Sequence, residues 1–199
     1  MEKRVSRILT DYRETIKPLL SDIKVRNRGS IPNNFLNEIR ALNDHIARCY
    51  RPDIKQQDVD AELTKAEGHL RRLVYDCFKQ LNIYICDTLV RKEKMFYSDL
   101  WLTHNDGKFW VEYSKNRKYA QINVIKAKKA ESIDSDKAMT LYEKAFQNYR
   151  HAEDLLIANK RMLLKSFLYK YIQKINHFGW WLLITVILSA IAAIIGIFW

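Results

Sequence analysis

Residues that form turns are scarce in this chain of 199 residues, which contains five glycines and three prolines. The prolines, Pro18, Pro32 and Pro52, all lie in the first quarter of the chain. A β-sandwich or barrel needs frequent turns, so this scarcity excludes both, and it argues against a fold of alternating strands and helices. Disorder is also excluded, because 48% of the residues are apolar and 12% are aromatic. The sequence therefore predicts an all-α protein.

Paired cysteines and common catalytic signatures are missing as well. The three cysteines, Cys49, Cys77 and Cys86, form no CxxC pair, and their pattern predicts buried free thiols in a reducing compartment. The chain has no glycine-rich phosphate loop, no GxSxG or HExxH motif, and no cluster of cysteine and histidine ligands. We therefore expect no cofactor and no metal.

Apolar periodicity predicts a bundle of long helices. They are expected at about 2–25, 33–50, 59–102, 109–130 and from 136 onward without a stop. The first should be kinked or split at Pro18. Ser30 or Asn33 is expected to cap the second helix, and Asp134 or Ser135 the fifth. The third carries an apolar stripe at steps of three or four, which is typical of a bundle or a stalk. The residues of this stripe are Leu63, Ala66, Leu70, Leu73, Cys77, Leu81, Tyr84 and Thr88.

An uncharged apolar run occupies the C-terminal end, at 178–199, and reads FGWWLLITVILSAIAAIIGIFW. As a helix it would rise about 33 Å, enough to cross a hydrocarbon core of about 30 Å. Trp180, Trp181 and Trp199 lie near its ends, as in an aromatic belt. Because lysines flank its N-terminal side, the run predicts a single-pass membrane protein with the domain at 1–177 in the cytoplasm.

Small and weakly polar residues recur along one face of this run. Thr185, Ser189, Ala192 and Gly196 are separated by four, three and four positions. Small residues at such spacing let helices approach closely. One interpretation is self-association, in which these residues form the contacts between helices or line a narrow lumen in a homo-oligomer. The alternative is ordinary sequence variation in a membrane anchor.

Arg40 and His45 form the one pair with a recognisable chemistry. They delimit the sequence Arg-Ala-Leu-Asn-Asp-His, and we expect both side chains on neighbouring parts of one helix surface. Histidine accepts a proton near neutral pH, as cleavage of RNA by its own 2′-hydroxyl requires. Arginine stabilises negative charge at the phosphorus centre without a metal. The alternative is a solvated helix face on which Arg40 pairs with Asp44.

With RALNDH at 40–45 and the apolar run at 178–199, the chain resembles the small membrane accessory proteins of type VI-B CRISPR loci. The resemblance implies a long-helix, HEPN-like bundle with a single C-terminal transmembrane helix in the bacterial inner membrane. It also implies an antiviral accessory that permeabilises this membrane and enhances an RNA-guided, RNA-targeting effector. Together with the small-residue stripe, it predicts a ring-shaped homo-oligomer with a central pore.

The resemblance leaves two other functions open. HEPN ribonucleases usually carry a polar residue directly after the arginine, where this chain has Ala41. We therefore expect little or no RNA cleavage and a structural or RNA-sensing role for Arg40 and His45. The alternative is a membrane-tethered, metal-independent HEPN ribonuclease that uses Arg40 and His45. A third hypothesis is a scaffold that anchors a partner protein to the membrane.

A basic run without acidic residues lies between Tyr113 and Ala130, in a chain of net charge +11. Its members are Lys115, Arg117, Lys118, Lys126, Lys128 and Lys129. Such a run suits RNA phosphates or anionic lipid headgroups. For a membrane-anchored chain the headgroup interpretation is the favoured one, and RNA is the alternative.

Overall fold

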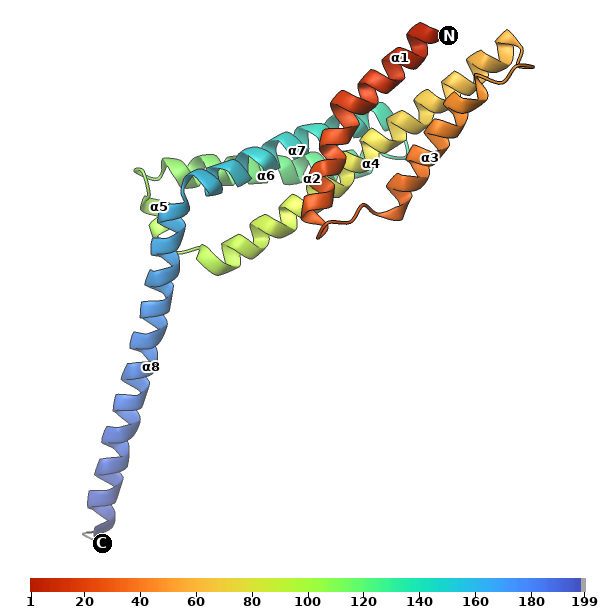
Figure 1. Ribbon diagram of the computed structural model, residues 1–199. Coiled ribbons are helices and arrows are strands. Elements are labelled where there is room, and N and C mark those ends of the chain that lie inside the picture. Colours follow the sequence, from red (N-terminus) through yellow and green to blue (C-terminus); the bar gives the residue numbers. More distant parts are fainter. Residues whose placement is uncertain (198–199) are drawn as a thin grey trace. The chain divides into compact units, whose positions relative to one another are not determined.

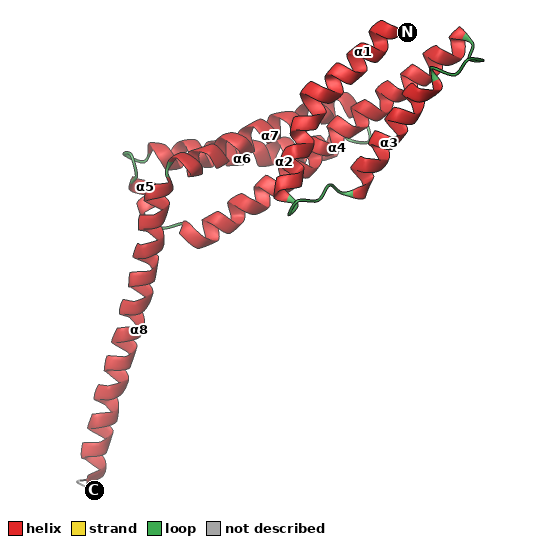
Figure 2. Cartoon of the chain, in the orientation of Figure 1, coloured by secondary structure: helices red, strands yellow, loops and turns green. Residues whose placement is uncertain are grey.

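The protein is described from a computed structural model, which covers the backbone of residues 1–197 and the side chains of 1–176 and 179–189. The described residues are largely helical and contain no strand (Figure 2), which confirms the all-α prediction. The elements in order (Figure 1) are α1 Glu2–Asp11, the π-helix η1 Tyr12–Ile16, α2 Lys17–Arg26, α3 Asn33–Arg48, α4 Gln56–Phe96, α5 Leu100–Thr103, α6 Lys108–Ala130, α7 Ser135–Ala158 and α8 Lys160–Ile197.

The chain divides into two compact units. The first unit comprises residues 1–88 and 116–151, and the second comprises 89–115 and 152–199. In the first unit, α3 lies alongside α4 (Figure 1), and one apolar core joins α1, α2, α3 and α4. The predicted apolar stripe of the long helix supplies much of this core, with Leu63, Ala66, Leu73, Cys77 and Leu81 fully buried. Periodicity therefore identified the buried face of α4 correctly.

Pro18 splits the first helix, as predicted. Proline lacks an N–H group, and its ring collides with the carbonyl four residues earlier. The chain accommodates both effects with the π-helix Tyr12–Ile16, and α2 then begins with Pro18 in its first turn. Ile16 of the π-helix is fully buried, so the local irregularity is compatible with the packing of the core.

Two predicted caps have different outcomes. Asp134 Oδ1 accepts hydrogen bonds from the backbone N–H groups of Asp136 (3.1 Å) and Lys137 (2.9 Å), which confirms it as the cap of α7. The expected cap of α3 by Ser30 or Asn33 is wrong. Pro32 holds the N-cap position without a side-chain hydrogen bond, and the Ser30 hydroxyl donates instead to a carbonyl within the preceding loop.

The predicted third helix is too long at its C-terminal end. The chain leaves α4 after Phe96 and forms the short helix α5, which carries Trp101 into an aromatic cluster of the second unit. The ring of Trp101 lies 5.5 Å from those of Phe109 and Tyr113, measured between centroids. Trp101 is fully buried, and burial of its large ring compensates for the interrupted helix.

The fifth predicted helix does stop, at Asn159. The side chain of Asn159 accounts for this break, because its Nδ2 donates to the Leu155 carbonyl (2.8 Å) and its Oδ1 contacts His104 Nε2 at 2.9 Å. Side-chain bonds of this kind compete with the backbone pattern of a helix. The polypeptide therefore forms two helices, α7 and α8, where periodicity predicted one.

The prediction of a single-pass inner-membrane protein is wrong. In the part of the chain that the structure describes, no helix is both long enough and apolar enough to cross a membrane. The apolar run forms the second half of α8, whose first half is basic. This finding does not test the predicted pore or the headgroup contacts, and both stay predictions.

Thiol labelling tests the packing around the cysteines. All three are free, Cys49 and Cys77 are buried, and Cys86 is partly exposed. Burial raises the pKa of the Cys77 thiol to about 12 and also raises that of Cys49. Because the thiolate is the reactive species, we expect an aromatic disulfide reagent to label Cys86 alone in the native protein. Labelling of all three thiols in denaturant is the control, and fast native labelling of Cys77 would contradict the burial.

Candidate functional site: two histidine–glutamate pairs

Two histidines meet on the contact between α3 and α4. His45 Nδ1 lies 2.7 Å from Glu62 Oε2, and His69 Nδ1 lies 2.7 Å from Glu38 Oε2. Each helix thus contributes one glutamate and one histidine, and the two pairs cross between antiparallel helices. The imidazole rings stack on each other, with centroids 5.1 Å apart and planes inclined by 25°.

The spacing along each helix explains this arrangement. Glu38 and His45 are seven residues apart, and so are Glu62 and His69. Seven residues make about two turns of an α-helix, so the members of each set lie on the same face. Two such faces packed antiparallel bring each glutamate opposite the histidine of the other helix. The repeated pattern Glu-x6-His was visible in the sequence, and sequence reasoning missed it.

Both glutamates are held ionised. Hydrogen bonds from His45 and then from Lys65 (Nζ–Oε1, 2.7 Å) lower the pKa of Glu62 to about 2. Burial raises the pKa of Glu38, but hydrogen bonds from His69 and Arg72 outweigh it, and the net shift is downward.

An ionised carboxylate only accepts hydrogen bonds, so Nδ1 of each histidine must carry the donated proton. Arg72 Nη2 also lies 2.7 Å from His69 Nδ1, but a nitrogen that donates to Glu38 does not at the same time accept from an arginine. This assignment leaves Nε2 of each ring as the nitrogen available to a ligand.

The site is shielded from solvent without being closed. The side chains of His45 and Glu62 are 14% and 13% exposed, and those of His69 and Glu38 are 18% and 26% exposed. Positive side chains surround them, since Arg48 and Lys65 pair with Glu62 and Arg72 pairs with Glu38. In the described residues, no group of three or more His, Cys, Asp or Glu side chains is arranged to hold a metal ion. The arrangement therefore suits proton transfer at a cationic surface.

Acid should weaken this contact between helices. The folded-state pKa of Glu62, about 2, lies below its ordinary value of 4.5. The stabilisation is therefore complete above about pH 5 and is lost as the pH falls toward 2. We expect Glu62→Gln to flatten the decrease in the free energy of unfolding over this range, measured by urea denaturation at several pH values. Glu2→Gln, on the exposed first turn of α1, is the control and should leave the decrease unchanged.

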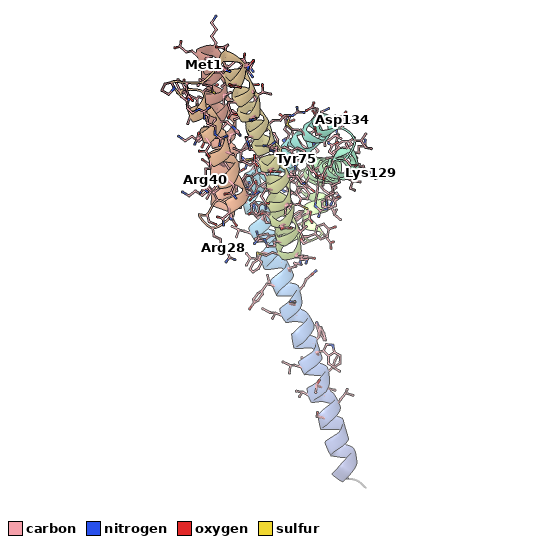
Figure 3. The ribbon with its side chains drawn as sticks, turned by 90° about the vertical axis from the view of Figure 1, so that its right-hand side faces the viewer. Met1, Arg28, Arg40, Tyr75, Lys129 and Asp134 are labelled. Atoms are coloured by element: carbon pink, nitrogen blue, oxygen red, sulfur yellow. The ribbon has the colours of Figure 1, made fainter. Side chains whose placement is uncertain are left out.

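Arg40 and His45 do not come together within one chain. Five residues turn a helix by about 140°, so the two side chains leave α3 in different directions. His45 faces α4, whereas Arg40 is exposed and points away from the bundle (Figure 3). Among the described residues Arg40 also makes no ion pair with Asp44. The structure joins His45 to Glu62 and His69 instead.

The predicted basic run lies on two faces of α6. Lys115, Lys118, Lys126 and Lys129 are exposed and share one face by their spacing. Figure 3 shows Lys129 and Arg40 on opposite sides of the first unit. Arg117 is partly buried, and Lys128 lines a cavity next to α4 and α7. Four lysines of the run therefore form one exposed stripe, and the other two basic residues, Arg117 and Lys128, face in another direction.

The small-residue stripe of the apolar run is described in part. Thr185 Oγ1 donates to the Trp181 carbonyl and Ser189 Oγ donates to the Thr185 carbonyl, both at 2.8 Å. These hydroxyls thus bond to their own helix. Ala192 and Gly196 lie outside the residues whose side chains are described.

Comparison with known proteins adds no family. No family model matches the chain, and no curated protein or solved structure matches it either.

Proposed function

We propose that this protein cleaves RNA without a metal, and that His45 and His69 transfer the protons. The single observation that carries this proposal is the stacked pair of imidazoles, each held by a glutamate through Nδ1. Two oriented histidines supply the base and the acid that cleavage by the 2′-hydroxyl requires. This proposal differs from the expectation based on Arg40 and His45, because His69 was not part of that pair.

The proposed reaction is an internal transfer at phosphorus. One imidazole Nε2 accepts the proton of the 2′-hydroxyl, and the 2′-oxygen forms a bond to phosphorus. The bond from phosphorus to the 5′-oxygen breaks, and the Nε2–H of the other imidazole protonates that oxygen. The products are a 2′,3′-cyclic phosphate and a free 5′-hydroxyl. The ring centroids lie 5.1 Å apart, and the proposed reaction requires the Nε2 atoms of both rings to face one phosphodiester.

Cations around the pair would hold the RNA and stabilise the transition state. The side chains of Arg48, Lys65 and Arg72 are 53%, 56% and 56% exposed, so each retains donors for a phosphate. Preformed donors at the reacting phosphate stabilise the charge that develops there. The exposed stripe of Lys115, Lys118, Lys126 and Lys129 offers a second phosphate-binding surface.

The wider role that we propose is that of a HEPN-like accessory to an RNA-guided, RNA-targeting CRISPR effector in antiviral defence. The sequence RALNDH at 40–45 and the all-helical fold support it. Self-association is part of this proposal. Arg40 is exposed and lies away from His45 of its own chain, so it is accessible to a second copy of the protein. The ring-shaped homo-oligomer stays a prediction.

Incubation of the purified full-length chain with labelled single-stranded RNA tests the proposal. We expect cleavage that persists in excess EDTA and leaves 2′,3′-cyclic phosphate ends, identified by mass spectrometry. The cleavage rate should fall in high salt, because salt weakens the binding of RNA phosphates to lysine and arginine side chains. Absence of cleavage on several RNA sequences, or products with 5′-phosphate ends, would rule out the proposed chemistry.

A further inference from the structure

One exposed surface lies on α6, a different helix from the two that carry the histidine pair. We define the α6 surface by Lys118, Tyr119, Lys126 and Lys129, which are all exposed and all belong to the first unit. Lys118 and Lys129 are eleven residues apart, so the surface extends about 16 Å along the helix. Eleven residues make nearly three full turns, which keeps these side chains on one face. Figure 3 shows Lys129 on the opposite side of the first unit from Arg40.

The three lysines of the α6 surface carry positive charge that the protein itself does not neutralise. No acidic residue occurs at 113–130, and in the described part of the chain none of these lysines forms an ion pair. The next carboxylate along the chain, Glu131, instead accepts a hydrogen bond from Tyr142 and pairs with Lys79 at 3.1 Å. A partner for this surface must therefore supply negative charge.

Tyr119 adds an exposed aromatic ring among these lysines. The residue is 49% exposed. Within the described residues its ring contacts no other aromatic ring and its hydroxyl makes no hydrogen bond. Tyr113, the other tyrosine of the basic run, is fully buried, stacks on Phe109 and donates to Glu93 at 2.7 Å. Of the two rings, Tyr119 is therefore the one available to a partner.

Lysines and an aromatic ring on one face suit a single strand of nucleic acid. Lysine ammonium groups bind its phosphates, and its bases stack on exposed aromatic side chains. A duplex does not offer the second contact, because its bases are already stacked on one another. Lipid headgroups supply phosphates as well, but they carry no aromatic base to stack on Tyr119. The two features together therefore favour a single strand over a duplex or a membrane surface.

We propose that the α6 surface binds single-stranded RNA, with one base stacked on Tyr119 and neighbouring phosphates paired with the three lysines. The proposal rests on the proposed function in one respect, because cleavage at the histidine pair identifies the nucleic acid as RNA. The α6 surface contains no histidine, so a strand held there is retained and not cleaved. Retention raises the local concentration of RNA around the protein. Loss of the surface should therefore raise the KM of cleavage and leave kcat unchanged.

The affinity for a labelled 2′-O-methyl oligouridine, measured by fluorescence anisotropy with the full-length protein, tests the stacking contact. Tyr119→Ala should raise the Kd about tenfold, within the range that loss of one stacked base produces. Tyr119→Phe keeps the ring and should leave the Kd nearly unchanged. Tyr50→Ala is the matched control, because Tyr50 is 58% exposed and lies outside α6. Equal weakening by Tyr119→Ala and Tyr50→Ala would overturn the assignment to the α6 surface.

The dependence of the same Kd on salt tests the phosphate contacts. Lys126→Gln should lower the slope of log Kd against log salt concentration by about 0.7, the contribution of one phosphate on a single strand. Lys3→Gln changes an exposed lysine of α1 and should leave the slope unchanged. An equal decrease for both variants would show attraction to net charge alone and would overturn the proposal.

A duplex and a lipid vesicle separate the proposed partner from its alternatives. Tyr119→Ala should leave the weaker affinity for a duplex of the same length unchanged. Weaker binding of Tyr119→Ala and Lys126→Gln to phosphatidylglycerol vesicles, with unchanged affinity for the single strand, would assign the surface to lipid headgroups and overturn the proposal.

The methylated strand also separates this proposal from RNA cleavage, because it lacks the free 2′-hydroxyl that cleavage requires. If the parent bound this strand through Tyr119 but cleaved no RNA, the α6 surface would be supported and the proposed function contradicted. If the parent cleaved RNA while Tyr119→Ala kept the parental Kd and KM, the α6 surface alone would be contradicted.

Discussion

Replacing His45 or His69 with glutamine is expected to slow RNA cleavage by about 10²–10⁴-fold, the usual contribution of a general acid or base. Glutamine keeps a hydrogen-bonding side chain of similar reach but does not exchange protons near neutral pH. The measurement is the single-turnover rate on a labelled RNA. The dependence of the parent rate on pH should be bell-shaped, because one imidazole acts as base and the other as acid.

Three comparisons separate chemistry from folding. Arg40→Gln should leave the single-chain rate within a few-fold, since Arg40 points away from the pair. Glu62→Gln should shift the pH profile, because Glu62 orients His45 and is a positioning residue. Circular dichroism must show that each variant is folded. If Arg40→Gln abolished cleavage while His69→Gln had no effect, the site would be the pair predicted from the sequence.

Replacing Trp101 with alanine is expected to lower the free energy of unfolding of the second unit by about 3–5 kcal/mol. Trp101 is fully buried, and its ring lies within 6.4 Å of those of Tyr97, Phe109, Trp110 and Tyr113, measured between centroids. Truncation to alanine removes these contacts and leaves a cavity. Hydrogen exchange followed by mass spectrometry should show the loss of protection at 89–115.

Trp101→Phe is the matched control for this prediction. Trp101 Nε1 makes no hydrogen bond with the described residues, so the substitution by phenylalanine removes no hydrogen bond. It also keeps an aromatic ring in the cluster, and the loss of stability should be well below that of the alanine variant. A loss as large for phenylalanine as for alanine would contradict the packing described for this cluster.

The helical body followed from local signals in the sequence. Apolar spacing along α4 identified Leu63, Leu73 and Leu81 as core residues, and all three are fully buried. Pro18 marked the break of the first helix, and Asp134 marked the start of α7. Each of these signals affects only residues a few positions away in the sequence. The apolar spacing acts through the helical period, the proline through steric restriction and the aspartate through a side-chain hydrogen bond. For that reason each can be interpreted without knowledge of the tertiary structure.

Two helix boundaries were missed because contacts between different helices decide them. The chain leaves α4 after Phe96, where periodicity still favours a helix, and this places Trp101 among aromatic rings from α6. Asn159 interrupts the last predicted helix while its amide contacts His104, which lies 55 positions earlier in the chain. Contacts between different helices leave no trace in the apolar period of one helix.

The sequence by itself determined that this protein is helical, where its buried faces lie and that Glu-x6-His recurs in two of its helices. Only the tertiary structure decided which histidine meets which glutamate. His45 pairs with Glu62 and stacks on His69 because α3 and α4 pack antiparallel in one register. A register is set by the packing of whole helix faces, and a shift of one turn would separate every one of these pairs.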